Sequence, residues 1–223
     1  MALEKLDAPL GKWLIPLTRS LSWVDPNTIT WLSGGIGIGS AVLLWRAGRD
    51  LSGAFLLLLA ALGIVLCFVL DILDGCVARM HGRTSNWGDF LDHTLDRIID
   101  TALLLAITHN SAWCPDPRWG WWTILSTLLA SYLGTQAKSS GLPRDLSGFG
   151  RNDRLATVLL GTLAAAVTAF VNGHDPTLGG LSPEAPATWN GLSTALAICC
   201  VGGVWTFIVR FRNSRRELSP PPV

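Results

Sequence analysis

The chain of 223 residues is 49% hydrophobic and 15% charged, and it contains eleven Trp. With a mean hydropathy of +0.40, this composition is too apolar for an ordinary soluble domain and predicts an integral membrane protein. The net charge of +1 is divided among many short segments and forms no continuous basic face, so we expect no nucleic-acid partner. The five cysteines show no metal-ligand spacing and are expected to be small core residues.

The first segment, residues 1–24, alternates apolar with charged residues and prolines. It lacks the continuous apolar stretch of a signal peptide and predicts an amphipathic helix lying on the membrane surface. The last segment, 212–223, ends in a proline-rich stretch and is predicted to be a disordered tail. Residues 25–211 are expected to form one membrane domain, with no second domain and no repeat.

Six hydrophobic segments predict six transmembrane helices and therefore an all-α bundle. They cover residues 28–45, 52–79, 88–108, 119–137, 155–171 and 189–209. The uninterrupted apolar stretch 54–70 alone spans roughly 25 Å, most of a hydrocarbon core of about 30 Å. A polar, glycine-rich loop, 138–154, separates the fourth predicted helix from the fifth.

The distribution of positive charge supports this arrangement. If both termini are cytoplasmic, thirteen of the seventeen Lys and Arg residues lie on the cytoplasmic face. They are Lys5, Lys12, Arg19, Arg79, Arg83, Lys138, Arg144, Arg151, Arg154, Arg210, Arg212, Arg215 and Arg216. Only Arg46, Arg49 and Arg118 fall on the opposite face. The positive-inside rule therefore predicts six spans, with both termini and the turn after the second helix on the cytoplasmic side.

Four aspartates flank that turn, in a protein whose helices are otherwise almost wholly apolar: Asp71, Asp74, Asp92 and Asp96. Spacings of three and four residues place each pair on one face of its helix. Acids at membrane depth are functional candidates, because carboxylates brought together there either take up protons or bind cations. Carboxylate oxygens without Cys or His ligands suit Mg²⁺ or Mn²⁺, which is often shared with a substrate phosphate.

Small residues beside the acids leave room for such a phosphate. Gly75 and Ala78 keep one helix face free of bulk, Gly88 does the same on the next helix, and the Arg79 guanidinium suits phosphate oxygens. By contrast, Asp89 and Asp100 are expected to be solvated or helix-capping residues, and a lone His93 is expected to pack beside the acids.

These residues resemble the signature of the CDP-alcohol phosphotransferase family, DxxDGxxAR, eight residues, then GxxxDxxxD. Every position matches, at Asp71, Asp74, Gly75, Ala78, Arg79, Gly88, Asp92 and Asp96. The six-helix layout, the N-terminal surface helix and the segment 26–30 also resemble the family. The resemblance implies a homodimeric membrane enzyme that transfers a substituted phosphate from a CDP-linked donor to an alcohol and releases CMP at the cytoplasmic surface.

The resemblance also implies residue roles. The four aspartates would hold one or two divalent ions, and Asp96 would also be the base that deprotonates the acceptor alcohol. The CDP pocket would comprise Asn27, Asp71, Gly75, Ala78, Arg79, Thr84 and Gly88.

The acceptor is expected near the loop after the fourth helix. The segment 131–155 resembles members that use CDP-diacylglycerol or CDP-archaeol, but Gly134 and Gln136 replace a Lys and an Arg typical of those members. Lys138, Arg151 and Arg154 either bind an acceptor phosphate, such as inositol or glycerol phosphate, or reflect membrane topology alone.

Alternative functions follow from the same features. Within the family, the reversed reaction would move a phosphoalcohol from a CDP-amino alcohol to a lipid alcohol. A cation-coupled transporter would also use membrane carboxylates, although those are expected near the midplane on broken helices. A prenyltransferase fits poorly, because only one compact acidic cluster is present.

Overall fold

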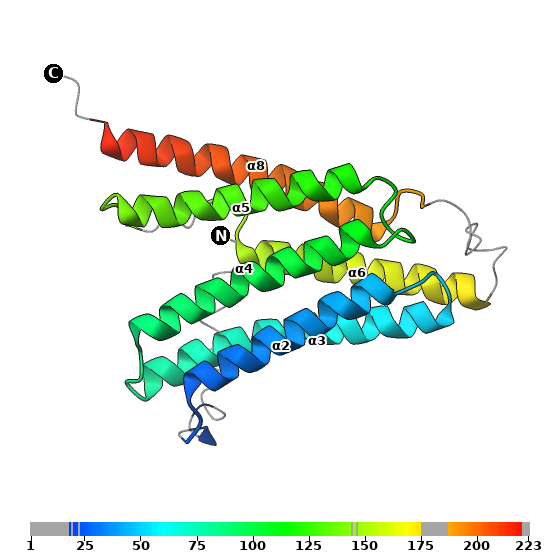
Figure 1. Ribbon diagram of the computed structural model, residues 1–223, viewed down its shortest axis with the longest axis horizontal. Coiled ribbons are helices and arrows are strands. Elements are labelled where there is room, and N and C mark those ends of the chain that lie inside the picture. Colours follow the sequence, from blue (N-terminus) through cyan, green and yellow to red (C-terminus); the bar gives the residue numbers. More distant parts are fainter. Residues whose placement is uncertain are drawn as a thin grey trace.

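The computed structural model describes residues 18, 20, 21, 23–143, 145, 147–174 and 187–219. These residues form six α-helices and no β-strand, which confirms the predicted all-α fold (Figure 1). The helices are α2 (Pro26–Arg46), α3 (Leu51–Met80), α4 (Asn86–His109), α5 (Pro117–Ser139), α6 (Arg151–His174) and α8 (Gly191–Leu218). Each overlaps one of the six predicted segments.

Two predictions concern the chain ends. The surface helix predicted for 1–24 lies almost wholly outside the described residues. The disordered tail predicted for 212–223 is wrong for 212–218, because α8 continues as a helix to Leu218. This stretch contains no proline or glycine that would end a helix, and the prolines begin only at Pro220.

Four helices, α2, α3, α6 and α8, are long and apolar enough to cross a membrane. The two others are less apolar because they bury polar groups. On α5, Thr123, Ser126 and Thr127 are buried, whereas the exposed side carries Trp121, Trp122, Leu125, Leu128, Leu129 and Tyr132. A helix with polar residues inside and large apolar residues outside is unsuited to water and well suited to lipid.

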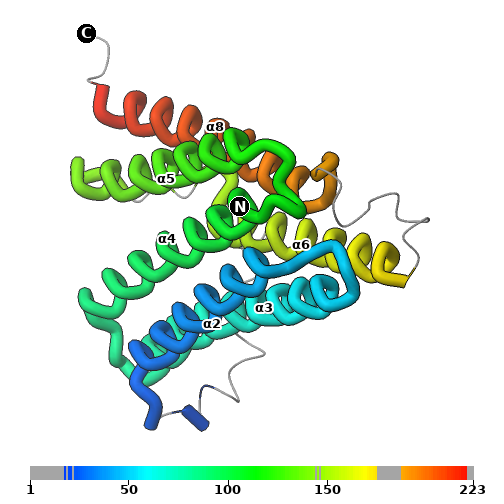
Figure 2. Tube along the Cα trace, turned by 45° about the vertical axis from the view of Figure 1, so that its right-hand side comes forward, coloured from blue at the N-terminus to red at the C-terminus, as the bar shows by residue number. Residues whose placement is uncertain are grey.

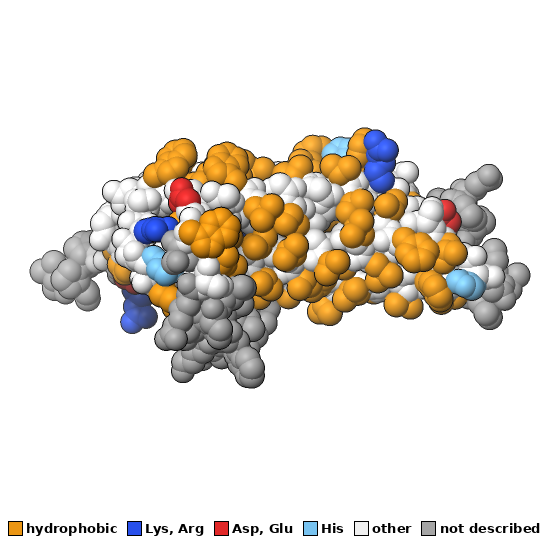
Figure 3. Space-filling model, turned by 90° about the horizontal axis from the view of Figure 1, so that it is seen from below, with side chains coloured by type: hydrophobic (Ala, Val, Ile, Leu, Met, Phe, Trp, Pro, Cys, Tyr) orange, Lys and Arg blue, Asp and Glu red, His pale blue; other side chains and the backbone are white. Residues whose placement is uncertain are grey.

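Large apolar residues on the outer surface are found on the other helices as well as on α5. Large apolar side chains are exposed on every helix, for example Leu62 on α3, Leu160 on α6 and Val201 on α8. In Figure 3 the apolar side chains cover the middle of the face shown, and the charged side chains lie toward its two ends. This distribution is typical of a protein surrounded by a hydrocarbon layer.

The interior is closed by small residues at helix crossings. Gly161 of α6 faces α8 so closely that a Cβ there would lie 2.7 Å from the Ala195 Cβ and 2.8 Å from the Gly191 carbonyl oxygen. Gly37 of α2 similarly leaves room for Ile99 of α4. Close approach of backbones is the usual source of helix association in membranes. The two views in Figures 1 and 2 show α4 between α2 and α5, with α8 beside α5.

The feature that most affects the site is the position at which α6 begins. In both views α6 starts well inside the bundle, whereas α5, the preceding helix, runs to the end of it (Figures 1 and 2). The connecting loop is held against α8, where the Phe149 N–H donates a 2.7 Å hydrogen bond to the Thr206 hydroxyl. Gly148 has a φ of +93°, and a Cβ there would lie 2.7 Å from the Thr206 oxygen, so the loop requires glycine at this point.

The first turn of α6 is stabilised by its own sequence. The Gly150 N–H donates to the Asp153 carboxylate at 2.9 Å, which is the reciprocal half of a capping box. The helix therefore starts at Arg151 and not at residue 155 as predicted. Arg151 and Arg154, predicted to lie in the loop, belong to a buried helical turn, and this turn brings them to the acids.

Candidate active site

The acids are carried by two helices that meet at a short turn. After α3 ends at Met80, the Arg83 N–H bonds back to the Ala78 carbonyl at 2.9 Å, with Gly82 in the left-handed region at a φ of +62°. The Ser85 hydroxyl then caps α4 by accepting from the Gly88 N–H at 3.0 Å. Beyond the turn α3 and α4 scarcely touch, and α2 packs against both. A space between the two acid-bearing helices is the result.

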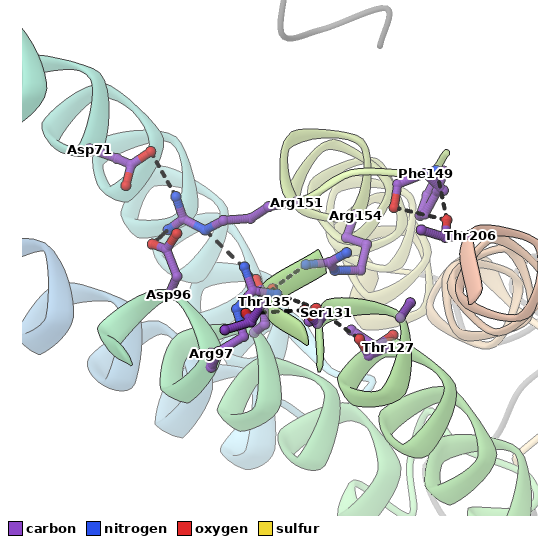
Figure 4. A network of polar contacts seen from close by, with 12 residues as sticks. Asp71, Asp96, Arg97, Thr127, Ser131, Thr135, Phe149, Arg151, Arg154 and Thr206 are labelled. Carbon is purple, nitrogen blue, oxygen red and sulfur yellow. Dashed lines mark hydrogen bonds and ion pairs between the residues drawn. The ribbon is translucent and has the colours of Figure 1, made fainter. Parts of the chain in front are cut away.

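Arg151 fills that space from α6. Its guanidinium lies 2.7 Å from the Asp71 carboxylate on α3 and 2.8 Å from the Asp96 carboxylate on α4. Figure 4 shows this side chain reaching between the two acids. Asp74, one turn further along α3, is buried and accepts a 2.7 Å hydrogen bond from the Thr30 hydroxyl of α2. The predicted pairing of acids across two helices is therefore present, with an arginine between them.

The acids have the chemistry expected of a divalent-metal site. Asp71 and Asp96 converge on one positive charge, and one ligand atom from each of Asp92, His93 and Asp96 lies within 4.8 Å of the other two. His93 does pack beside the acids, with Nδ1 3.5 Å from the Asp92 carboxylate and Nε2 3.3 Å from that of Asp89. Hard oxygen ligands from several carboxylates fit Mg²⁺ or Mn²⁺.

A cavity of about 230 Å³ opens on one side of the acids. Six of the residues predicted for the CDP pocket line it together: Asn27, Gly75, Ala78, Arg79, Thr84 and Gly88. Asp74 and Asp92 form its acidic wall. A Cβ on Gly88 would lie 3.3 Å from the Asn27 amide oxygen, and one on Gly75 would lie 3.2 Å from the Arg79 guanidinium. The glycines therefore keep this cavity open. We call it the donor-side cavity.

A larger cavity, of about 460 Å³, opens on the other side, and we call it the acceptor-side cavity. Asp71 and Asp96 form its border with the acids, so Asp71 lines this cavity and not the one predicted for it. Four arginines from three helices also line it: Arg97, Arg151, Arg154 and Arg210. Ser131, Tyr132, Gly134 and Thr135 of α5 complete one wall. Four guanidinium groups around a single cavity are suited to an anion that carries more than one negative charge.

Sequence reasoning missed two of these arginines. Arg97 lies inside the third predicted helix, and it donates a hydrogen bond to the Ser131 hydroxyl. Arg210 had been attributed to membrane topology. Its Nε donates to the Ser147 carbonyl at 3.1 Å and its Nη1 to the Ala130 carbonyl at 2.8 Å, in the room that Gly134 leaves. In sequence Arg210 resembles Arg212, Arg215 and Arg216, and only the fold separates it from them.

Lys138 is not brought to this cavity. It lies near the exposed end of α5 with its ammonium 3.8 Å from the Asp89 carboxylate, and it lines neither cavity. Asp100 also differs from expectation. It is neither solvated nor capping, since its side chain is only 4% exposed and lies beside Arg154.

The loop that holds Arg210 is itself charged. Partial burial raises the pKa of Asp145, but hydrogen bonds from Ser147 and Asn213 and the charge of Arg210 outweigh burial, so the pKa is lowered overall. An ionised Asp145 ties the loop to α8 through the Asn213 amide at 3.1 Å.

Comparison with known proteins identifies the family. Residues 23–205 match the family described as CDP-alcohol phosphatidyltransferase. The chain belongs to this family. A phosphatidylinositol phosphate synthase from Streptomyces avermitilis is 30% identical over 201 residues, which cover 87% of this chain and 73% of that protein. An archaetidylinositol phosphate synthase from Methanothermobacter thermautotrophicus is 33% identical over 133 residues, which cover 60% of this chain and 64% of that protein.

Solved structures show the same fold. A phosphatidylinositol phosphate synthase from Mycobacterium tuberculosis with CDP-DAG bound aligns with a TM-score of 0.65 at 22% identity, covering 98% of this chain and all of that one. The same enzyme in complex with manganese and citrate aligns with a TM-score of 0.67 at 24% identity, covering 93% and 92%. The predicted family is confirmed. This phosphatidyltransferase is a membrane transferase of phospholipid biosynthesis, and the transporter alternative is set aside.

Replacing Asp92 tests the metal site. We expect Asp92→Asn to abolish transfer and to weaken Mn²⁺ binding, because a neutral amide is a poorer ligand for a hard cation than a carboxylate. Titration of Mn²⁺ followed by its electron paramagnetic resonance signal measures the affinity. Asp116→Asn, at the start of α5 near the opposite end of the bundle, is the matched control. Full activity of Asp92→Asn would refute the metal site.

Proposed function

We propose that this enzyme transfers a phosphatidyl-type group from CDP-diacylglycerol or CDP-archaeol to a phosphorylated polar alcohol, such as inositol phosphate or glycerol phosphate, and releases CMP. The observation that carries the proposal is the acceptor-side cavity, where four arginines line a space bordered by the catalytic acids. The relatives described above are named as synthases of inositol phosphate lipids, which agrees with a phosphorylated acceptor.

The donor occupies the other cavity in this proposal. The CDP moiety lies against Gly75 and Gly88, with Arg79 beside its phosphates and Asn27 and Thr84 at the wall. The lipid chains extend along the apolar outer surface into the membrane. Asp71, Asp74, Asp92 and Asp96 would hold one or two Mg²⁺ or Mn²⁺ ions, which, when bound, neutralise charge developing on the pyrophosphate.

The acceptor hydroxyl approaches from the arginine side. Asp96 lies at the border of the two cavities and takes the hydroxyl proton. The freed oxygen forms a bond to the lipid-bearing phosphorus, and the bond from that phosphorus to the oxygen of CMP breaks, so CMP leaves with the electron pair. The four arginines hold the acceptor's own phosphate away from this centre and orient the hydroxyl toward it.

The reversed reaction is less consistent with the cavity. Its acceptor would be an uncharged lipid alcohol, which has no anion for the four arginines of the acceptor-side cavity to bind. We also propose, from the family resemblance and the charge distribution, that α4 and α5 complete six membrane spans and that the enzyme forms a homodimer. The mass of the protein in detergent tests the dimer.

An acceptor screen tests the function. We expect purified enzyme with Mn²⁺ and CDP-diacylglycerol or CDP-archaeol to release CMP when inositol phosphate or glycerol phosphate is added. Free inositol and free glycerol, which lack the phosphate, should give little release. CDP-choline with diacylglycerol serves as the control for the reversed reaction. Release from that pair, with none from the CDP-lipids, would overturn the proposal.

Arg210 tests the anion site separately. We expect Arg210→Gln to raise the KM for the phosphorylated acceptor by roughly 10- to 100-fold, because a hydrogen bond to a charged group contributes about 1.5–3 kcal/mol. The KM for the CDP-lipid should be unchanged, since Arg210 does not line the donor-side cavity. Arg215→Gln, further along α8 and exposed, is the matched control. Equal effects of the two variants would contradict the assignment.

Topology is testable with two labelled sites, one at each end of α8. We propose that the acids and both termini face the cytoplasm, because the Lys and Arg residues gather at that end of the bundle. A cysteine introduced at Ser219, after α8, should react with a membrane-impermeant maleimide only after cells are opened. Cysteine introduced at Thr188, before α8, should react in intact cells. The opposite labelling pattern would invert the topology.

A further inference from the structure

Asp100 is not one of the four aspartates that the sequence predicts to bind metal or CDP. It lies on α4 one turn beyond Asp96, deeper in the bundle, and its side chain is only 4% exposed. A carboxylate at that depth needs partners, since leaving it unpaired is strongly unfavourable. Asp100 lines neither the donor-side nor the acceptor-side cavity.

Its partners are three arginines from two helices. The Arg154 Nη2 lies 2.5 Å from Asp100 Oδ2, and the Arg97 Nη1 lies 3.7 Å from the same oxygen. Asp100 Oδ1 faces Arg151, whose Nε is 4.0 Å away. All three arginines line the acceptor-side cavity. Asp100 therefore lies behind the cationic wall, on the side away from the ligand.

The charges explain why such a residue is needed. Guanidinium groups gathered around one cavity repel one another, and the arginines of α6 are almost buried, with Arg151 10% and Arg154 7% exposed. The negative charge of Asp100, on the side of the arginines away from the cavity, offsets this repulsion. It also fixes which edge of each guanidinium faces away from the cavity. The remaining N–H groups are then available to the cavity. Arg97 is held by a second contact, since it also donates a hydrogen bond to the Ser131 hydroxyl of α5. Figure 4 shows Arg97, Arg154 and Ser131 close together.

We propose that Asp100 is a positioning residue for the acceptor site: it holds Arg154 and Arg97 from behind, so that their remaining N–H groups face the acceptor's phosphate. The proposal rests on the proposed function, because it needs an anionic acceptor in the acceptor-side cavity. Asp100 itself touches no substrate. Its ion pairs are with arginines of the acceptor-side cavity, and Arg79, the arginine of α3 in the donor-side cavity, is not among them.

The test compares the two substrates in one variant. Asp100→Asn keeps the shape and removes the charge, and we expect it to raise the KM for the phosphorylated acceptor at least roughly tenfold. The KM for the CDP-lipid and the Mn²⁺ affinity should be unchanged, and kcat at saturating acceptor should remain close to that of wild type. Asp100→Glu, which restores the charge, should recover part of the acceptor affinity. A merely structural role would alter both KM values together and would overturn the proposal.

A second variant keeps the proposal testable if Asp100→Asn does not fold. In the double variant Asp100→Asn, Arg154→Gln the buried arginine is removed together with its partner, so the packing no longer contains that unpaired charge. We expect its acceptor KM to be close to that of Arg154→Gln alone, because Arg154 is the nearest of the arginines that contact Asp100. An acceptor KM equal to that of wild type in the double variant would overturn the proposal.

Failure of the proposed function is distinguishable from failure of this inference. If wild-type enzyme releases no CMP from CDP-lipids with any phosphorylated acceptor, the function itself is wrong. If wild type is active but Asp100→Asn leaves its acceptor KM unchanged, only the positioning role is wrong.

Discussion

The ion pairs of Arg151 connect the parts of the structure that make the site. One guanidinium from α6 joins Asp71 of α3 to Asp96 of α4, two helices that scarcely touch each other beyond their turn. Desolvating three charged groups is costly, and the pairing is favourable only because the geometry satisfies all of them together. The distance between the acid-bearing helices, and therefore the border between the two cavities, depends on this side chain and on α2, which packs against both helices.

Arg151 reaches the acids because α6 begins inside the bundle. The loop before it descends along α8, held by the Thr206 hydroxyl and by a glycine at position 148 that no other residue replaces without strain. Had α6 begun at the level where α5 ends, its first-turn arginines would be at the membrane surface with the solvated Lys and Arg residues. The conformation of this loop, distant from the acids, thus decides which arginines lie beside the acids and which lie at the exposed end of the bundle.

The sequence predicted the parts of the site that depend on local spacing. The carboxylates, spaced by three and four residues, lie with their small neighbours on two consecutive helices. The donor-side cavity is therefore lined by six of the seven residues predicted for it, all but Asp71. The acceptor side is built from α4, α5, α6 and α8, and its composition depends on tertiary packing. For that reason the sequence did not reveal the positions of Arg97 and Arg210, and it did not separate Lys138, which lies outside the cavity, from Arg151 and Arg154, which line it. Helix positions were predicted well because lipid imposes a length and a polarity on each helix, whereas the start of α6 depends on a cap formed by Asp153 and was placed too late.

The division of charge between the two cavities suits the two anionic substrates of the proposed function. A CDP-lipid and a phosphorylated alcohol repel each other, and both must come within bonding distance of one phosphorus. In the donor-side cavity three aspartates outnumber the two arginines, Arg79 and Arg83, whereas in the acceptor-side cavity four arginines outnumber the two aspartates. In the proposed function, a bound cation would offset the acids for the donor's pyrophosphate, whereas the acceptor's phosphate would be attracted by the arginines directly. Asp71 and Asp96 line the acceptor-side cavity beside the other acids. In the proposed function, their negative charge would keep the acceptor's phosphate among the arginines while its neutral hydroxyl approaches.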